Sequence, residues 1–526
     1  MSDSRHTETA FEDCVEAGFV ASGFVAVADG LFDREKAFFP SVVLHFIRET
    51  QPKEWQKLEA LHAEKTGQQI IADLCKWMDA HGSLATLRHG FKCYGRTLRV
   101  AFFKASHDLN PELESRYAAN RVGITRQLHY STRNNNSLDV CLSVNGIPVV
   151  TLELKNAQTG QTVDHAMKQY RNDREPRETL FEFKRRTLVH FAVDTDSVMM
   201  TTRLAGAATH FLPFNVGDDG GAGNPANPNG YRTSYLWEDS LSRDSLLDLF
   251  ARFIHLQIDQ RRSEDGRKFT VESMVFPRFH QLRAVRKLVD LARSAGPGSN
   301  YLIEHSAGSG KSNTIAWLAH RLASLHDDNN QRVYDSVIVI TDRQVLDRQL
   351  QETIYQFEHR QGVVQKIDEN SKQLAEALES GVPIIITTLQ KFPFVTRQLL
   401  KLAEERGDTS TGILPTRRCA VIIDEAHSSQ SGETATDLRE VLGGESLIEK
   451  AREAAEADES KQFEELYRSM AKRGKQANLS LFAFTATPKH KTLKVFTENG
   501  EAHDKYTMRQ AIVEGFILDV LQNYTT

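Results

Sequence analysis

The chain has 526 residues, of which 40% are hydrophobic and 26% are charged. This length is too great for one ordinary core and predicts about two to four domains, while the composition excludes wholesale disorder, a collagen-like fibre and a coiled-coil rod. The formal net charge is −5, from 65 Lys and Arg against 70 Asp and Glu. Contacts with nucleic acid therefore have to be local rather than spread over a basic surface.

The cysteines and the N-terminus indicate a cytoplasmic protein. The five cysteines are scattered without a Cys-x-x-Cys pair, which argues against a disulfide framework or a zinc site and favours a reducing compartment. The N-terminal segment MSDSRHTETAFEDC lacks the basic and apolar regions of a signal peptide. No apolar run approaches the roughly 20 residues that cross a bilayer, so we expect no membrane partner.

The first half of the chain mixes helices and strands. Apolar spacing predicts helices over Thr9–Ser22 and Pro52–Glu64 and a strand over Ile147–Leu154. The segment Val216–Tyr231 is dominated by Gly, Asp, Asn and Pro, which is typical of a long surface loop. Apolar residues at helical spacing predict a further helix over Leu241–Arg262. We place the first domain boundary after this segment, near residues 262 to 275.

A possible metal site lies in the first half. Asp139 stands in one strand-like run, and Glu153 and Lys155 stand in the next. Two carboxylates on strands can share Mg²⁺, and a lysine can position or deprotonate the hydrolytic water and stabilise the developing phosphorane charge. Because side chains alternate along a strand, Glu153 and Lys155 share one face. These three residues are our candidate catalytic set, with Asp139 and Glu153 as metal ligands.

The pairing register decides whether this set can form. Asn145-Gly146 is a strong signal for a two-residue hairpin turn. Such a turn pairs Val144 with Ile147 and would leave Asp139 and Glu153 on opposite faces. A shared site requires Val144 opposite Pro148, through a three-residue loop or a bulge, and we expect that register.

The second half alternates short β-branched runs with helical stretches, which predicts a parallel sheet covered by helices. After the strand-like YLIEH, a glycine-rich segment leads into a helix, as in loops that bind phosphate through backbone N–H groups. His305 occupies the place of the first Gly of the pattern GxxxxGK[ST]. The expected nucleotide-binding residues are Gly308, Ser309, Gly310, Lys311 and Ser312, with Ser312 also a Mg²⁺ ligand.

A second acidic motif completes the nucleotide site. The apolar run Ala420–Ile423 ends in Asp424 and Glu425, followed by Ala and His. Asp424 can hold Mg²⁺, and Glu425 can orient and deprotonate the water that attacks the γ-phosphate. We therefore predict an ATPase that uses ATP and Mg²⁺.

Other segments resemble motifs of superfamily 2 helicases. Thr485–Pro488 (TATP) is similar to the motif that couples the nucleotide site to nucleic acid, and FPRFHQ before the phosphate loop is similar to the adenine-recognition segment, with Gln281 as the candidate. Ser446–Gln476 is predicted to be a solvated helical hairpin. Polar residues at strand ends that could contact a phosphate backbone, or simply cap helices, are Thr341, Asp342, Arg343, Thr387, Thr388 and Gln390.

From about Arg121 through the Gly/Asn loop, YLWED (Tyr235–Asp239) and the motor motifs, the chain resembles the R subunit of type I restriction enzymes. The resemblance implies an α/β fold with a PD-(D/E)xK nuclease-like domain at 1–262 and one RecA-like parallel-sheet lobe at 263–505. Residues 506–526 would begin a linker to a second lobe. Asp139, Glu153 and Lys155 become the cleavage residues, and Lys311, Asp424 and Glu425 the ATPase residues.

The resemblance also implies a function and partners. The chain would contribute to ATP-dependent translocation along double-stranded DNA and to Mg-dependent cleavage of unmethylated DNA, in complex with M (methyltransferase) and S (specificity) subunits. Leu138 departs from the Pro of the nuclease motif, and Gln169 and Tyr170 are adjacent instead of forming the Gln-x-x-x-Tyr element. Glu12 could add a further acid, although we interpret it as a solvent-facing helix residue.

Two other functions fit the same motifs. One is a stand-alone superfamily 2 DNA helicase or ATPase whose nuclease-like domain only binds DNA. The other is a non-catalytic docking protein in which bound ATP holds a conformation.

Overall fold

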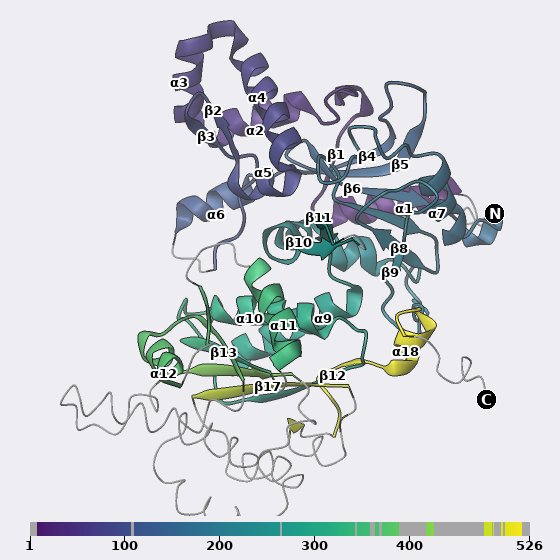
Figure 1. Ribbon diagram of the computed structural model, residues 1–526. Helices are drawn as coiled ribbons and strands as arrows, with labels where there is room; N and C mark the ends of the chain where they lie inside the picture. Colours follow the sequence, from purple (N-terminus) through teal and green to yellow (C-terminus); the bar gives the residue numbers. More distant parts are fainter. Residues whose placement is uncertain are drawn as a thin grey trace, which may run out of the picture. The chain divides into compact units, whose positions relative to one another are not determined.

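The computed structural model describes residues 8–106, 110–263, 266–341, 344–357, 363–367, 371–388, 417–424, 478–486, 488, 496–497 and 500–517. The chain forms two compact units, shown in Figure 1. The first unit comprises Met1–Asp219 and Gly223–Arg278, and the second comprises Gly220–Ala222 and Phe279–Thr526. We expected the boundary near residues 262 to 275, and the units divide after Arg278. The assignment of these ranges to functional domains stays a prediction.

A mixed seven-stranded sheet forms the centre of the first unit, in the order β1-β4-β5-β6-β7-β8-β9. Its pairs are antiparallel except for β1 with β4 and β6 with β7, which are parallel. Helix α7 packs on β6 and β7, and α1 packs on β4. The strands are β1 Val25–Ala26, β4 Val122–His129, β5 Ser137–Val144, β6 Ile147–Leu154, β7 Val189–Val193, β8 Val198–Thr201 and β9 Leu212–Pro213.

Helices surround this sheet and form a separate cluster above it in Figure 1, where α2 to α5 enclose the small β2–β3 hairpin. The predicted helices at Thr9–Ser22 and Pro52–Glu64 are confirmed as α1 and α3. The elements outside the sheet are α1 Glu8–Ala21, α2 Pro40–Thr50, α3 Pro52–His62, α4 Thr66–His81, α5 Ser83–His89, β2 Phe91–Cys93, β3 Arg96–Leu98, α6 Pro111–Ala118 and α7 Val163–Asn172.

The prediction of a helix over Leu241–Arg262 is wrong for the second half of that segment. Helical structure runs through α8 Arg243–Asp248 and a π-helical turn at Leu249–Phe253, and then the chain enters strand β10, His255–Arg262. Strand β10 pairs with β11, Lys268–Val275. The sequence HLQIDQRR also alternates apolar and polar residues, so pairing with a partner strand prevailed over local helical spacing. The predicted loop at Val216–Tyr231 contains no helix or strand, as expected.

The second unit is built on a seven-stranded, fully parallel sheet in the order β14-β15-β13-β16-β17-β12-β18. This confirms the expected parallel sheet, whose strands are almost continuously apolar because both faces are covered. The elements are α9 Phe279–Ala295, β12 Asn300–His305, α10 Lys311–Ala323, β13 Ser336–Thr341, α11 Gln344–Gln356, β14 Val364–Lys366, α12 Ser371–Ser380, β15 Ile384–Thr388, β16 Cys419–Ile423, β17 Leu479–Thr485, β18 Asp504–Tyr506 and α18 Met508–Val513.

Several predictions lie outside the described residues: the helical hairpin at Ser446–Gln476, and residues Asp342, Arg343, Gln390, Glu425 and Thr487. Within the ranges that the structure describes, no helix is both long and apolar enough to span a bilayer.

Candidate nuclease and nucleotide sites

A bulge in the β5–β6 hairpin brings the two predicted carboxylates to one face of the sheet. Val144 pairs with Ile147 around a two-residue turn, so the expected pairing of Val144 with Pro148 is wrong. Asn145 and Gly146 have φ of 50° and 88°, the left-handed conformation that this turn requires.

The register shifts farther along, where Ser143 pairs with Pro148 but Leu142 pairs with Val150. Val149 is the additional residue, as in a β-bulge, which was the alternative route to a shared site. Val140 then lies opposite Leu152, and continuing this register by one step places Asp139 on the same face as Glu153.

Asp139 is held in place by three neighbours. Its Oδ2 accepts a hydrogen bond from the Leu154 backbone N–H at 2.7 Å and lies 3.8 Å from Lys155 Nζ. The Gln127 side-chain amide donates to Oδ1 at 3.4 Å. Asp139 is 8% exposed, so the carboxylate borders solvent while its orientation is fixed.

Glu153 is fully buried, and one of its oxygens has no hydrogen-bond partner among the described residues. Arg174 Nε donates to Glu153 Oε1 at 2.6 Å, whereas Oε2 accepts no hydrogen bond from any residue that the structure describes. Burial raises the pKa of Glu153 to about 8, and the nearby charge of Asp139 adds to this, against the opposing effect of Arg174. A buried carboxylate oxygen without a donor is costly and requires an explanation, such as a bound cation.

Arg174, which the sequence did not single out, fixes Glu153. Its guanidinium is 3% exposed and also donates to the Ser137 carbonyl at 2.8 Å and to the Tyr130 hydroxyl at 3.4 Å. Burial alone would lower the pKa of Arg174, but the charge of Glu153 and the hydrogen bond to it raise that pKa above its ordinary value. No sequence motif marks this residue, because it follows α7 and meets β6 only in the folded sheet.

Glu12 is not the solvent-facing residue that we expected. It is 8% exposed, and its Oε1 accepts a hydrogen bond from Gln127 Nε2 at 3.2 Å, the same nitrogen that reaches Asp139. Arg126 pairs with Glu12 Oε2 at 2.9 Å. A single amide therefore links Glu12 to the carboxylate of Asp139, which places the first helix at the edge of the site.

Of the adjacent pair Gln169 and Tyr170, only Tyr170 enters the buried network. Its hydroxyl hydrogen-bonds with Thr151 Oγ1 at 2.8 Å, and Thr151 Oγ1 also lies 2.8 Å from His190 Nδ1. Burial lowers the pKa of His190 to about 3, so this ring is neutral. Thr151 precedes Glu153 by two residues on the same face of β6, so the network supports the strand beneath the candidate site.

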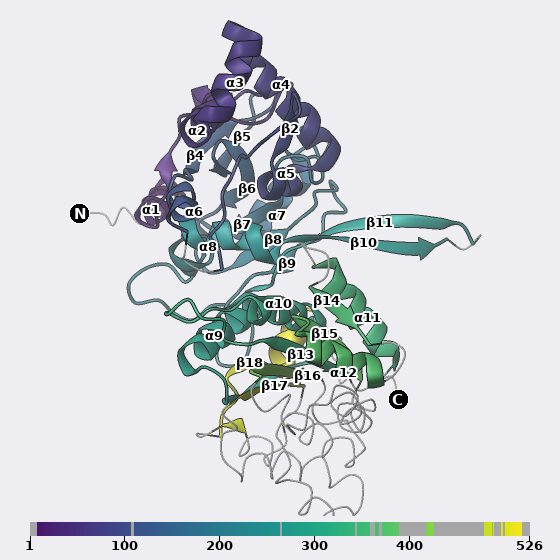
Figure 2. The same ribbon diagram turned by 90° about the vertical axis from the view of Figure 1, so that its left-hand side faces the viewer.

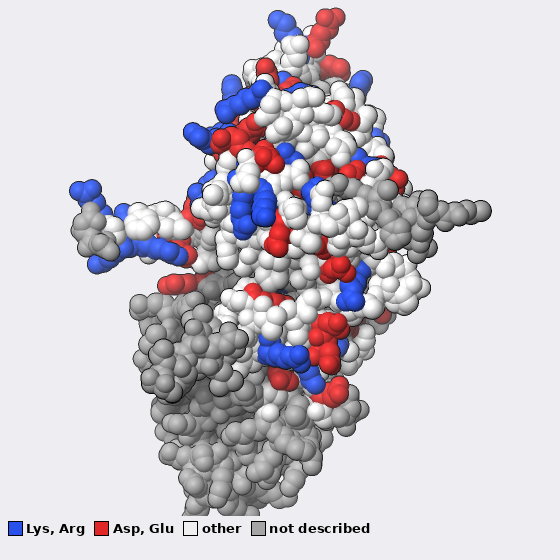
Figure 3. Space-filling model, turned by 90° about the vertical axis from the view of Figure 1, so that its right-hand side faces the viewer, with Lys and Arg blue, Asp and Glu red and all other residues white. Residues whose placement is uncertain are grey.

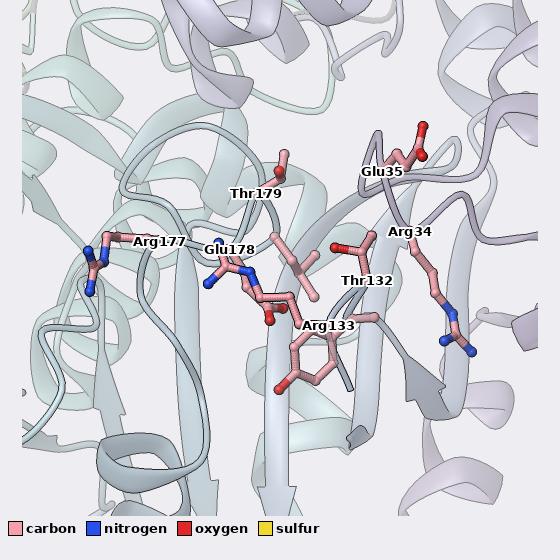
Figure 4. A pocket seen from close by; sticks show the side chains of 9 residues that line it. Arg34, Glu35, Thr132, Arg133, Arg177, Glu178 and Thr179 are labelled. Carbon is pink, nitrogen blue, oxygen red and sulfur yellow. The ribbon is translucent and has the colours of Figure 1, made fainter. Parts of the chain in front are cut away.

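An open cavity of about 260 Å³ lies beside this site, shown in Figure 4. Tyr130, whose hydroxyl contacts Arg174, lines it together with Arg34, Arg133, Arg177 and Glu178. In Figure 4, Arg34 and Arg177 lie at opposite ends of the cavity. The lining therefore mixes both signs of charge.

The phosphate-loop sequence forms the expected connection between a strand and a helix. Residues 306–310 join β12 to α10, and Lys311 begins the helix. Gly308 has φ of 72°, and a Cβ atom there would come within 3.1 Å of Ile517 and 3.2 Å of the Phe516 carbonyl. Burial lowers the pKa of Lys311, while the charge of Asp424 acts in the opposite direction. Lys311 and Asp424 are thus brought together, and Ser312 lies on the first turn of α10.

Gln281 contacts the phosphate loop itself. Its side-chain amide donates to the carbonyls of Ser309 at 3.3 Å and Gly310 at 3.0 Å, and His280 Nε2 lies 3.0 Å from the same Ser309 carbonyl. Gln281 is 2% exposed. The adenine contact predicted for it stays a prediction, and the structure adds a bracing role for the loop.

His305 has a structural reason for replacing glycine. It is fully buried, and its Nε2 lies 3.0 Å from Asp504 Oδ1 on the neighbouring strand β18. Arg283 Nε pairs with the other Asp504 oxygen at 2.9 Å. Burial alone would raise the pKa of Asp504, but these two partners lower it. The first glycine position is therefore used to tie β12 to β18, while within the loop 306–310 positive φ occurs at Gly308 and Gly310.

Among the described residues, no group of three or more His, Cys, Asp or Glu side chains is arranged to hold a metal ion. The predicted metal ligands are Asp139 and Glu153 in the first unit and Ser312 and Asp424 in the second.

Comparisons with known proteins agree with this division. Residues 100–209 match the family model of the type I restriction enzyme R protein N terminus, and residues 280–449 match that of the SWI2/SNF2 ATPase. The first unit therefore carries the R-protein match, and the parallel sheet of the second unit carries an ATPase match.

Curated relatives are endonuclease subunits of type I restriction enzymes. The subunit from Staphylococcus aureus strain COL is 25% identical over 325 residues, covering 60% of this chain and 30% of that protein. The HindI subunit from Haemophilus influenzae is 26% identical over 327 residues, covering 60% of this chain and 28% of that protein. The UvsW helicase of bacteriophage T4 gives a TM-score of only 0.24 at 12% identity, covering 45% of this chain and 61% of that one.

These matches support the recognition of the chain as the N-terminal portion of a type I restriction enzyme R subunit, as the sequence resemblance indicated. It spans about 30% of the length of the curated relatives described above.

Proposed function

We propose that the first unit is a Mg²⁺-dependent endonuclease with a PD-(D/E)xK-type site, and that Asp139, Glu153 and Lys155 carry its chemistry. The observation that carries this proposal is the pair of carboxylates on one face of the β5–β6 hairpin, with the unpartnered, buried oxygen of Glu153 beside Asp139. Carboxylate oxygens are the ligands that Mg²⁺ prefers, so these residues fit the ion.

Each residue of the proposed site would have a different role in hydrolysis. Glu153 Oε2 and the carboxylate of Asp139 would hold Mg²⁺, which when bound supplies a Lewis acid for the phosphodiester. Lys155 Nζ, close to Asp139, would position the attacking water, hold its proton and balance the charge that grows on the phosphate. Arg174 would keep Glu153 in the orientation that leaves Oε2 free for the metal.

The second unit would bind and hydrolyse ATP as one RecA-like lobe. The loop Gly308-Ser309-Gly310 with Lys311 would hold the phosphates, Ser312 and Asp424 would ligate Mg²⁺, and Glu425 would activate water. Gln281 would brace the loop from behind and contact the adenine. In the full-length protein, ATP hydrolysis would drive translocation along double-stranded DNA.

The remaining parts of the proposal concern the whole enzyme. The R subunit would act in the cytoplasm with M and S subunits, cut unmethylated DNA and leave sequence recognition to its partners. This chain spans only part of its relatives, so these activities are proposed for the full-length protein.

The test is cleavage of unmethylated plasmid DNA by the full-length protein with its M and S subunits. Lys155→Ala should lower cleavage by about 10²- to 10³-fold, the usual cost of losing a group that stabilises developing charge, and leave ATP hydrolysis intact. Lys311→Ala should abolish ATP hydrolysis. The exposed Lys65→Ala is the matched control. Full cleavage by Lys155→Ala would instead favour a helicase whose nuclease-like unit only binds DNA.

A further inference from the structure

A long two-stranded ribbon stands clear of the body of the first unit (Figure 2). Strands β10 and β11 pair over eight residues, from His255 with Val275 to Arg262 with Lys268. From Gln260 onward, every described residue of the ribbon through Thr270 is exposed except Ser263, which is half-buried. An isolated two-stranded ribbon is only marginally stable in water, and packing against another surface stabilises it.

Cations gather on the far part of this ribbon. Arg261, Arg262 and Lys268 are exposed and form no ion pair among the described residues. Arg262 and Lys268 are directly paired across the two strands, an arrangement of like charges that destabilises a sheet. The cost would be removed by an anion bound between the two side chains.

The acidic residues nearer the base of the ribbon are already engaged. The Gln257 side-chain amide donates to both carboxylate oxygens of Asp259 at 3.0 Å. Glu272 pairs with Lys184 in the body of the unit. Figure 3 shows Lys and Arg side chains along the ribbon, with acidic side chains nearer its base. Glu264 and Asp265, between the strands, lie outside the described residues.

Apolar side chains accompany the cations. Phe269, opposite Arg261, is 46% exposed, and Ile258 is 49% exposed. Cations with an exposed aromatic ring suit a nucleic-acid surface, where phosphates meet the cations and sugars or base edges meet the apolar groups. The major groove of duplex DNA is wide enough for a two-stranded β-ribbon.

We propose that the β10–β11 ribbon is a contact for duplex DNA, in which Arg261 on one face and Arg262 with Lys268 on the other bind backbone phosphates, and Phe269 packs against the groove beside Arg261. The partner class rests on the proposed function, which makes DNA the substrate. The contact is sequence-independent, because phosphates carry no base identity.

The experiment measures the affinity of the 526-residue chain for a short fluorescent DNA duplex as salt is varied. The ribbon variant replaces Arg261, Arg262 and Lys268 by Gln, and the control replaces three exposed lysines of the helical cluster, Lys53, Lys65 and Lys76, by Gln. Both lose the same charge. The ribbon variant should reduce the slope of log K against log salt by about 3, near 0.9 for each lost phosphate contact, and the control should leave it nearly unchanged.

A second variant tests charge separately from fold. Arg261→Lys with Arg262→Lys keeps the cations and should keep the salt slope. Equal slopes for the ribbon and control variants would overturn the proposal, as would a ribbon variant that binds DNA normally but no longer assembles with M and S subunits, since the ribbon would then bind protein. Failure of the nuclease proposal would give a different result. The wild-type chain would still bind DNA through the ribbon, but the full-length enzyme would cleave DNA equally well with and without Lys155→Ala.

Discussion

The two candidate sites are positioned by different features of their sheets. In the first unit, the residues lie on the face of a mixed sheet, so the register between β5 and β6 and a buried arginine decide their geometry. In the second unit, the residues lie in loops at the ends of parallel strands, as is usual where ligands bind open α/β sheets. A site on a sheet face is sensitive to a one-residue shift, whereas a site in strand-end loops is sensitive to what braces the loop.

The largest effect should follow from removing the buried partner of Glu153. Above the Glu153 pKa of about 8, where the side chain is ionised, Arg174→Gln leaves a carboxylate buried without its cation, which typically costs about 3–5 kcal/mol of stability. Hydrogen exchange at the amides of β5 and β6 measures the loss. Arg177→Gln, at an ion pair whose arginine side chain is 87% exposed, should cost little.

A double variant separates the ion pair from the arginine itself. Arg174→Gln combined with Glu153→Gln should recover much of the protection, because no buried charge remains. If the double variant is as unprotected as the single one, the pair is not what stabilises this hairpin.

The pH dependence of cleavage should distinguish the two sites next. Burial raises the pKa of Glu153 to about 8 from the ordinary 4.5, so below that pH the side chain is mostly protonated and cannot ligate a cation. At limiting Mg²⁺, cleavage should therefore rise about tenfold per pH unit up to about 8 and then level off.

Raising Mg²⁺ should move this midpoint to lower pH, because the ion binds only the ionised carboxylate. ATP hydrolysis by the same preparation should lack that midpoint. A cleavage rate that stays constant between about pH 6 and about pH 8 at limiting Mg²⁺ would contradict Glu153 as a ligand.

The smallest effect concerns the brace behind the phosphate loop. Gln281→Ala removes two hydrogen bonds to loop carbonyls, at a cost of about 1 kcal/mol, and should weaken ATP binding about fivefold. Because the brace acts on the loop, GTP binding should weaken by the same factor. The exposed Gln331→Ala is the control. A loss confined to ATP would show that Gln281 reads the adenine instead.

The sequence could predict the features whose signals lie within one continuous segment. The strand Ile147–Leu154 and the connection of strand, loop and helix around Lys311 are confirmed, because their signals are local and contiguous. The bulge at Val149 was an open alternative only, since one residue more or less between strands leaves the hydrophobic pattern readable in either register.

Non-local contacts account for what was missed. Arg174 meets Glu153 only after the chain has crossed from β6 through α7, and the burial of Glu12 depends on Arg126 and Gln127 from a distant strand. Likewise, β10 was mistaken for helix because its partner β11 lies beyond it in the sequence. Spacing along one segment carries no information about such partners.

The way in which β6 pairs with β7 has a further consequence for the order of assembly. Those strands are parallel, so the chain must pass through α7 and the segment carrying Arg174 before β7 can pair with β6. During synthesis, the β5–β6 hairpin with its two acids is made before Arg174, the residue that orients Glu153. A nascent chain that ends before residue 174 would contain Asp139 and Glu153 but lack the arginine that orients Glu153, so it should not form an ordered pair of carboxylates.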